Sequence, residues 1–105
     1  MRQQIATKTG TGSSNVIATD TYISPFNVGF GVFVTGTANI TIQHTFDNPQ
    51  TVASPTWYNH PTVASIALTD AGQDGNYAFP VAAIKILVNS GSGTARMTLI
   101  QAGIA

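Results

Sequence analysis

The segment ANITIQHTFD, residues 38–47, limits what this chain can fold into more than any other part of the sequence. Apolar side chains and His44 occupy every second position, and polar side chains occupy the positions between them. This alternation has the period of a half-buried β-strand and not that of a helix. The preceding segment, NVGFGVFVTG at residues 27–36, alternates in the same way, with its Val side chains and Phe30 on one face. The short link TGTA between the two segments predicts a β-hairpin.

A second pair of strands is predicted near the C-terminus. AAIKILVNS (82–90) and TARMTLIQA (94–102) flank the turn GSG, so we expect them to form another hairpin. The side chains that alternation directs toward the core are Ile84, Ile86, Val88, Ala95, Met97 and Leu99. Ile100 falls on the opposite face, with Arg96 and Thr98. This position predicts either a contact with another subunit or a bulge that turns Ile100 inward.

The rest of the chain is rich in Thr, Val and Ile and is interrupted by Gly, Asn and Pro, which is typical of short antiparallel strands. Further strands are expected at residues 15–22 and 62–68, followed by a loop at 69–76 that contains an Asp-Gly turn signal. Residues 1–14 are expected to form an N-terminal arm or an edge strand, and residues 15–105 a single domain. The sequence therefore predicts an all-β fold: an antiparallel, jelly-roll-like β-sandwich of about eight short strands.

The charge content of the chain excludes several classes of function. Only 8% of the 105 residues are charged, against about 25% in a typical soluble domain, and the charges cancel. Four scattered cations do not form a basic face, so we expect neither direct nucleic-acid binding nor docking on a membrane. The N-terminal segment lacks the apolar stretch of a signal peptide, so synthesis in the cytoplasm is expected. A domain without net charge tends to associate, which indicates either coverage in an assembly or solubility through hydroxyl and amide groups.

The titratable side chains do not form a recognisable catalytic or metal-binding pattern. The chain has no cysteine, and the only candidate ligand set is His44, Asp47 and His60. Alternation places His44 and Asp47 on opposite faces of one strand. The aspartates of TDAG, QDGN and FDNP occupy positions where turns use such side chains to bond the backbone. We therefore predict no catalytic residue, no metal and no cofactor.

The loop SPTWYNHP, residues 54–61, places the only Trp of the chain beside a Tyr and a His, between two prolines. Trp and Tyr combine a large apolar area with a hydrogen-bonding tip, which suits both an interface anchor and a plug at the open end of a sandwich. Both roles remain open, with one ring inward and the other outward. The candidate partner contacts are Trp57, Tyr58, His60 and Ile100.

Four segments together, HTFDNP, SPTWYNHP, DGNYAFPVAAIKILVNSGSGT and MTLIQAG, resemble small proteins encoded in the structural cassettes of tailed bacteriophages and prophages. In those proteins a His-Thr-Phe-Asp strand end, a Pro-Thr-Trp loop and a Gly-Asn-Tyr-Ala-Phe-Pro segment recur in the same order. Within this group the chain is similar to the capsid cement, or decoration, proteins of short-tailed phages, such as the jelly-roll cement protein of a Bordetella phage. The resemblance covers residues 38–103.

The resemblance implies a jelly-roll sandwich on the outside of an icosahedral phage head, made in the cytoplasm of the host bacterium. It implies a homodimer that bridges neighbouring major capsid protein subunits, with no enzyme activity, no metal and no direct DNA contact. An alternative function is a carbohydrate-binding module of a phage tail or fibre. In that reading Trp57 and Tyr58 would stack on sugar rings, and hydroxyl groups would be bound by Asp47, Asn48, Asn59 and His60.

Overall fold

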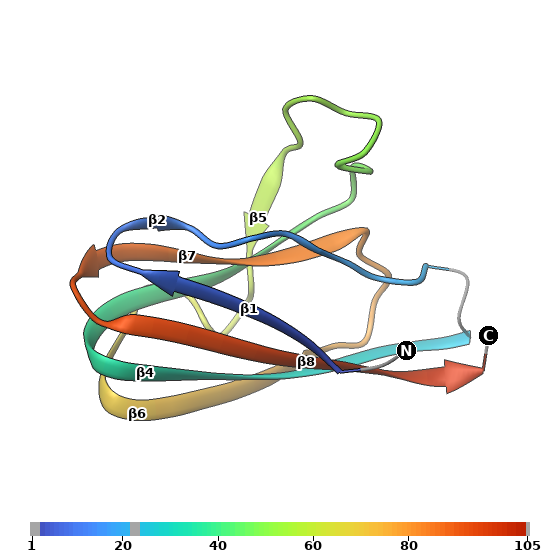
Figure 1. The fold of residues 1–105 in the computed structure, drawn as a ribbon. Helices are drawn as coiled ribbons and strands as arrows, with labels where there is room; N and C mark the ends of the chain where they lie inside the picture. Colours follow the sequence, from blue (N-terminus) through green and yellow to red (C-terminus); the bar gives the residue numbers. More distant parts are fainter. Residues whose placement is uncertain (1–2, 22–23, 105) are drawn as a thin grey trace.

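The computed structural model describes residues 3–21 and 24–104, and these residues form an antiparallel sheet with no helix. The strands are β1 (Gln4–Thr9), β2 (Gly12–Ser13), β3 (Ile17–Ala18), β4 (Ser24–Thr45), β5 (Trp57–Asn59), β6 (Ile66–Tyr77), β7 (Ala83–Gly91) and β8 (Thr94–Ile104). The sheet folds over on itself into two layers that face each other (Figure 1). The predicted all-β, jelly-roll-like β-sandwich is confirmed.

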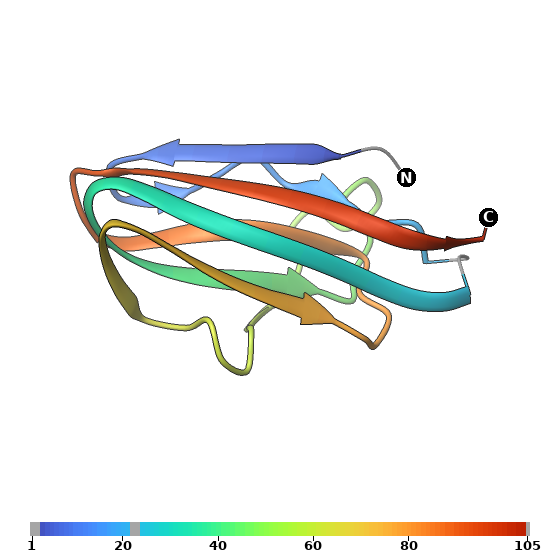
Figure 2. The same cartoon turned by 90° about the horizontal axis from the view of Figure 1, so that it is seen from below.

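Two long strands belong to both layers, because each bends partway along its length. The first part of β4, as far as Thr35, pairs with β8, and the second part, from Ala38, pairs with β7. β6 follows β4 through the same bend. Layer one therefore contains β1, β8, the first part of β4 and the second part of β6, and the last three lie side by side in Figure 2. Layer two contains the other parts of β4 and β6 together with β7, β2, β3 and β5.

The two predicted hairpins are not formed. Residues 27–36 and 38–45 belong to the single strand β4, and β7 and β8 each pair with β4 and not with each other. Both links, TGTA and GSG, are corners at which the chain passes from one layer to the other. A short link that contains glycine suits such a corner as well as it suits a hairpin turn, which is why the sequence pattern pointed to the wrong pairing.

Three glycines, Gly36, Gly91 and Gly93, meet where these corners touch, and we call this end of the sandwich the glycine corner. Gly91 has φ +99°, and a Cβ added to it would lie 2.5 Å from the carbonyl oxygen of Thr37. A Cβ on Gly93 would lie 2.8 Å from the carbonyl oxygen of Thr35. The Gly93 N–H donates to the Thr37 carbonyl over 2.9 Å, so backbone packs directly against backbone.

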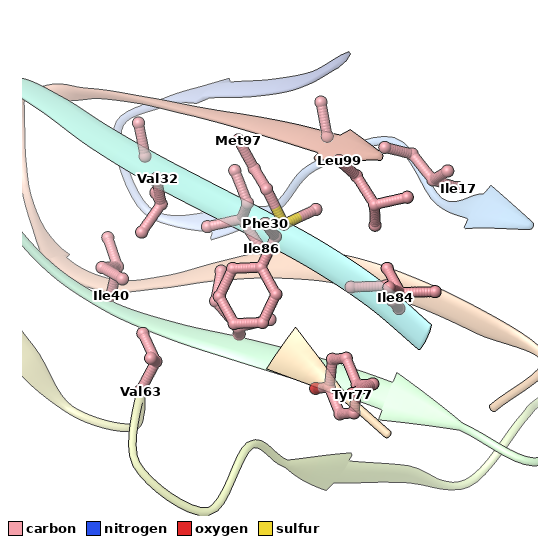
Figure 3. Close-up of a cluster of buried hydrophobic side chains, with 14 of the residues drawn as sticks. Ile17, Phe30, Val32, Ile40, Val63, Tyr77, Ile84, Ile86, Met97 and Leu99 are labelled. Atoms are coloured by element: carbon pink, nitrogen blue, oxygen red, sulfur yellow. The ribbon is translucent and has the colours of Figure 1, made fainter. Parts of the chain in front are cut away.

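The side chains that alternation directed inward form the core between the layers (Figure 3). The buried residues of β4, β7 and β8 include Val28, Phe30, Val32, Val34, Ile40, Ile42, Ile84, Ile86, Val88, Ala95, Met97 and Leu99. Burying one such large side chain contributes about 1.5–3 kcal/mol to stability. The predicted inward faces are therefore confirmed except at Phe46, even though the predicted hairpins are not formed.

The predicted loop at 69–76 is wrong, because these residues lie within β6. Asp70 has φ +45° and stands at the bend of the strand, where its Oδ1 accepts a hydrogen bond from the Gly36 N–H over 2.8 Å. Gly75 lies within β6, two residues before its end, and the Phe30 and His60 rings occupy the space that a side chain there would need. A Cβ there would lie 2.8 Å from Phe30 Cζ and 3.2 Å from His60 Cε1.

Two other predicted strands have different bounds from those expected. The strand predicted at 62–68 begins only at Ile66 and continues as β6 to Tyr77, and the one predicted at 15–22 is reduced to β3. Its last residue, Tyr22, lies outside the described residues, as do residues 1–2 of the predicted N-terminal arm and Ala105.

The N-terminal segment forms β1, which pairs with β8 and is the edge strand of layer one. The Asn15 side chain bonds the outer side of this edge. Its Oδ1 accepts from the Thr7 N–H over 3.4 Å, and its Nδ2 donates to the Ile5 carbonyl over 3.5 Å. Asn15 thus occupies backbone groups to which a further strand would bind.

Candidate functional site

Seven aromatic and histidine rings form a continuous cluster where β4 and β6 end and β7 begins, opposite the glycine corner. Four rings are buried: Phe30, His44, His60 and Tyr77. Three stand at the surface, where Phe46 is 56% exposed, Tyr58 50% and Phe79 41%. We call these three the aromatic rim.

The aromatic rim is assembled around His44 from three separate segments. Tyr58 lies opposite His44 in the pairing of β4 with β5, Phe46 follows the last residue of β4, and Phe79 lies between β6 and β7. The His44 ring centroid is 5.5 Å from that of Phe46, 5.9 Å from Tyr58 and 5.6 Å from Phe79. Alternation had placed Phe46 inward with His44, but β4 ends at Thr45 and the Phe46 side chain points into solvent.

A buried hydrogen bond supports the rim from beneath. His44 Nδ1 lies 2.9 Å from the Tyr77 hydroxyl, and the two ring centroids are 4.8 Å apart. Burial raises the pKa of Tyr77, so the hydroxyl keeps its proton and can donate it to Nδ1. Burial also lowers the pKa of His44, and the nearby His60 lowers it further. His44 is therefore a neutral ring fixed in one orientation.

His60 connects the loop after β5 to β6 and β4. Its Nε2 lies 3.0 Å from the Asn76 carbonyl, which only accepts, so Nε2 carries a proton. Its Nδ1 accepts hydrogen bonds from the backbone N–H groups of Thr62 and Val63 over 3.2 and 3.1 Å. Both nitrogens are used within the chain and the ring is buried. His60 therefore stabilises the loop after β5 against β6 and is not exposed to a partner.

Trp57 and Tyr58 point to opposite faces of β5, because successive side chains of a strand alternate. Tyr58 joins the rim, whereas Trp57 lies on the outer face of layer two. The Lys85 ammonium stands 4.3 Å from the Trp57 ring centroid and donates a hydrogen bond to Ser13 Oγ over 3.0 Å. Burial lowers the pKa of Lys85. The two neighbouring rings of the loop therefore belong to different surfaces.

Ile100 points outward from layer one, on the face that alternation had assigned to it, and no bulge turns it inward. The predicted partner contacts Trp57, Tyr58, His60 and Ile100 thus lie in four separate environments, and only Tyr58 belongs to the rim. Phe46 and Phe79 complete the rim but were not predicted as contact residues. The sequence feature that could have identified Phe79 is an aromatic residue next to a proline in a link between two strands.

The polar residues near the rim are committed to local structure. Asp47 Oδ2 accepts a hydrogen bond from the Thr56 N–H over 2.9 Å, nine residues along the chain. The local turn bond, which the FDNP signal had assigned to Asp47, is made by Asn48, whose Oδ1 accepts from the Gln50 N–H over 3.0 Å. In residues 3–21 and 24–104, no three His, Asp or Glu side chains come together as they would around a metal ion. No buried side-chain nitrogen or oxygen of the described part lacks a hydrogen-bond partner. The polar groups named here are therefore engaged within the chain.

One recess lies beside the rim. It has a volume of about 510 Å³ and is bordered by Phe46 and by polar side chains that include Thr19, Asn48 and Gln50. The described residues also contain no helix long and apolar enough to span a membrane.

The sequence matches no protein-family model and none of the curated proteins with which it was compared. Among solved structures, the fold is similar to that of a subunit of Bacillus endospore appendages, a family of disulfide-linked pili (TM-score 0.52, 16% identity, 99% of this chain and 87% of that one). It also aligns with the CBM22-1 xylan-binding domain of Paenibacillus barcinonensis Xyn10C (TM-score 0.48, 8% identity, 98% and 83%). A third alignment is with the CBM22-1–GH10 modules of Clostridium thermocellum xylanase 10B (TM-score 0.45, 12% identity, 96% and 25%). At these identities the pilus likeness shows the fold alone, and the two lower-scoring alignments carry no inference. The described residues form an all-β, antiparallel sandwich.

Proposed function

We propose that this protein is a non-catalytic structural protein of a bacteriophage virion that binds the outer surface of the head and clamps neighbouring major capsid protein subunits. The observation that carries the proposal is the aromatic rim, in which three rings from separate segments stay about half exposed over a buried, hydrogen-bonded floor. The resemblance of residues 38–103 to capsid cement proteins supports the choice of partner.

The rim has the properties of a contact surface. Clustered apolar side chains at the surface of a small domain mark interaction sites, whereas single ones do not. Aromatic rings dominate the energy of such contacts when their orientation is set in advance. Here the buried pair His44 and Tyr77 holds the rings from below, so little order is lost on binding.

The low charge of the chain determines how such a contact would work. Residues 3–21 and 24–104 contain only three cations, Lys8, Lys85 and Arg96, and Lys85 is engaged with Trp57 and Ser13. Apolar area and backbone hydrogen bonds would therefore supply the affinity. Binding of this kind depends weakly on salt, unlike a contact made by surface charges.

Stabilisation of the head would follow from differential affinity. A protein that binds the assembled lattice more tightly than free subunits shifts the equilibrium toward assembly by that difference. Because many symmetric copies bind one head, their modest individual contacts sum to a large stabilisation of the shell.

The proposal is tested by co-sedimentation of the purified protein with empty phage heads that lack it. We expect saturable binding to heads, no binding to free capsid subunits, and little change when the salt concentration is raised. Phe79→Ser and Tyr58→Ser should each weaken binding at least about tenfold, as truncation of a central aromatic contact does. Their thermal unfolding should stay close to that of the wild type, because both rings are already half exposed.

The matched control is Val16→Ser, which removes an exposed apolar side chain outside the ring cluster and should leave head binding unchanged. Absence of wild-type binding, or equal weakening by Val16→Ser and the rim variants, would contradict the proposal.

The second candidate function is carbohydrate binding on a phage tail or fibre, and the recess beside Phe46 favours it, because an aromatic ring there borders amide and hydroxyl groups. The predicted sugar-binding set is not assembled, since Trp57 and Tyr58 lie on opposite faces and Asp47, Asn59 and His60 are bonded within the chain. A glycan array distinguishes the candidates: saturable binding to a glycan that is lost in Phe46→Ser would favour this second function.

A further inference from the structure

Strand β6 forms a long edge of the sheet that no other described strand covers. It pairs with β4 along one side only, and it lies at the margin of layer one (Figure 1). From Ala71 to Tyr77 it keeps an unbroken register with residues 28–34 of β4, so this part is a regular edge. An edge strand presents unpaired backbone groups to which another chain can add a strand.

The other edges of the described sheet are occupied or short. On the outer side of β1, the Asn15 side chain bonds the Thr7 N–H and the Ile5 carbonyl. β2 and β3 contain two residues each, and β5 contains three. The β6 edge therefore differs from the rest of the sheet both in its length and in its accessibility.

A hydrogen bond near the end of β6 shows which backbone groups face outward. The Asn76 carbonyl accepts from His60 Nε2 over 3.0 Å, so it points away from β4. In an antiparallel pair, residues whose backbone groups point away from the partner strand alternate with residues whose groups point toward it. The N–H and carbonyl groups of Gly72 and Asp74 therefore also face away from β4. Among the described residues, none bonds these groups on that side.

The side chains beside this edge form an anionic position and an apolar position on the outer face of layer one. Asp74 is exposed, and no described side chain bonds its carboxylate, since Arg96 of the same face lies beyond β4 on β8. Gly72 has no side chain, and a Cβ there would lie 3.3 Å from Phe33 Cδ2. The Phe33 ring is 51% exposed. Asp74 and Phe33 both border a shallow concavity of about 430 Å³.

We propose that the β6 edge binds an extended segment of a partner protein as an additional strand, with a cationic side chain opposite Asp74 and an apolar side chain opposite Gly72. In strand addition, backbone hydrogen bonds supply affinity and alternate side chains supply specificity. Alternate side chains lie on one face of a strand, so the partner segment carries its apolar and basic residues with one residue between them. The apolar side chain would cover the exposed Phe33 ring.

A second copy of this chain fits the edge less well than a basic partner does. Pairing of two β6 edges would bring two Asp74 carboxylates onto one face of the joined sheet, where like charges are destabilising. It would also place no cation opposite Asp74, because β6 contains no Lys or Arg. The three residues of the aromatic rim lie outside β6, so this inference does not rest on the proposed binding to phage heads.

The test is a titration of the full chain with a synthetic peptide, followed through the backbone amide signals by NMR. The peptide Thr-Arg-Thr-Leu-Thr-Arg-Thr, capped at both ends, presents Leu and Arg at the required spacing in either strand direction. We expect saturable shifts and slower hydrogen exchange at the N–H groups of Gly72 and Asp74, and none at Thr7 on the β1 edge. The same peptide with Glu in place of both Arg residues should bind at least about fivefold more weakly, because it brings like charges together.

Substitutions separate the backbone, charge and apolar parts of the site. Asp74→Pro removes an N–H that the fold does not use, so it should abolish peptide binding while thermal unfolding stays close to that of the wild type. Asp74→Asn keeps this N–H and removes the charge, which should weaken binding about two- to fivefold. Phe33→Ser should weaken binding by a similar factor, whereas Phe79→Ser, on the rim, should leave it unchanged.

Absence of shifts in β6 at the highest soluble peptide concentration would overturn the proposal, as would equal affinity for the two peptides. Peptide binding at wild-type strength by a folded Asp74→Pro chain would overturn it too, because the segment would then not be held by the edge. The peptide titration does not involve phage heads and the co-sedimentation does not involve the peptide. Failure of this inference and failure of the proposed function are therefore distinguished.

Discussion

The two ends of this sandwich are closed by different means. At the glycine corner, β4, β6 and the β7–β8 connection pass from one layer to the other with backbone against backbone, and a Cβ on Gly91 would overlap the Thr37 carbonyl. At the opposite end the strands stop, and rings fill the gap, with His44 and Tyr77 inside and the aromatic rim outside.

The difference accounts for the position of the proposed contact surface at the ring-closed end. Closure by backbone has no space for a larger residue at Gly91 or Gly93. Closure by rings stacks the inner rings in the core and leaves the outermost ones half exposed. An end closed by side chains can therefore bind a partner through residues that the fold itself hardly needs.

The largest expected effect comes from placing a side chain at the glycine corner. Gly91→Ala forces a Cβ to within 2.5 Å of the Thr37 oxygen at a residue with φ +99°. Strained φ and overpacking together should lower the free energy of unfolding by roughly 3–5 kcal/mol. Urea denaturation followed by Trp57 fluorescence measures the change.

Gly29→Ala is the control for this prediction, because the new Cβ would meet nothing within 4 Å. It should alter stability by less than about 0.5 kcal/mol. Equal effects of the two substitutions would show that the corner is not closed by backbone contact.

A smaller effect is expected at the ring-closed end. Tyr77→Phe keeps the ring contacts but leaves His44 Nδ1 without its partner, which should cost about 1–2 kcal/mol. The double variant with His44→Phe should lose less than the sum of the single variants, since both partners of the bond are then removed. Strict additivity in denaturation measurements would show that the bond does not support the rim.

The smallest effect is a dependence of stability on pH, confined to the ring-closed end. Burial, with His60 nearby, lowers the pKa of His44 in the folded chain below its ordinary value of 6.5. The unfolded chain therefore binds the proton first, and the free energy of unfolding should fall as the pH drops below about 6.5 until folded His44 also titrates. Denaturation at several pH values should show this loss, and His44→Phe should reduce it. An unchanged pH dependence in that variant would assign the effect to another group.

The alternation of the sequence predicted which side chains enter the core. The buried side chains of β4, β7 and β8 follow directly from a period of two, because a strand with one buried face must place every second side chain in the core. The sequence did not predict which strands pair with each other, because a link such as TGTA has the same composition whether the chain folds back in one layer or crosses to the other layer. The Asp-Gly pair at 74–75 misled for a related reason: Gly75 serves to make room for the Phe30 and His60 rings and not to turn the chain.

The candidate site could be predicted only in part. Tyr58 was identified from its loop, but the loop contains the short strand β5, whose alternation separates Tyr58 from Trp57. Phe46 and Phe79 are brought together with Tyr58 only by the tertiary fold, at ring-centroid distances of 5.7 Å and 6.3 Å along Tyr58–Phe46–Phe79. No spacing in the sequence carries that information.

The continuity of β4 has a mechanical consequence. In a sandwich whose layers are connected only by loops, sliding of one layer over the other is resisted by side-chain packing, which consists of many weak contacts. Here β4 runs for 22 residues through both layers, and β6 bends beside it. Sliding would have to stretch two hydrogen-bonded strands along their covalent backbone. We expect the molecule to be stiff against shear between its layers, a property suited to a part that must transmit tension without changing shape.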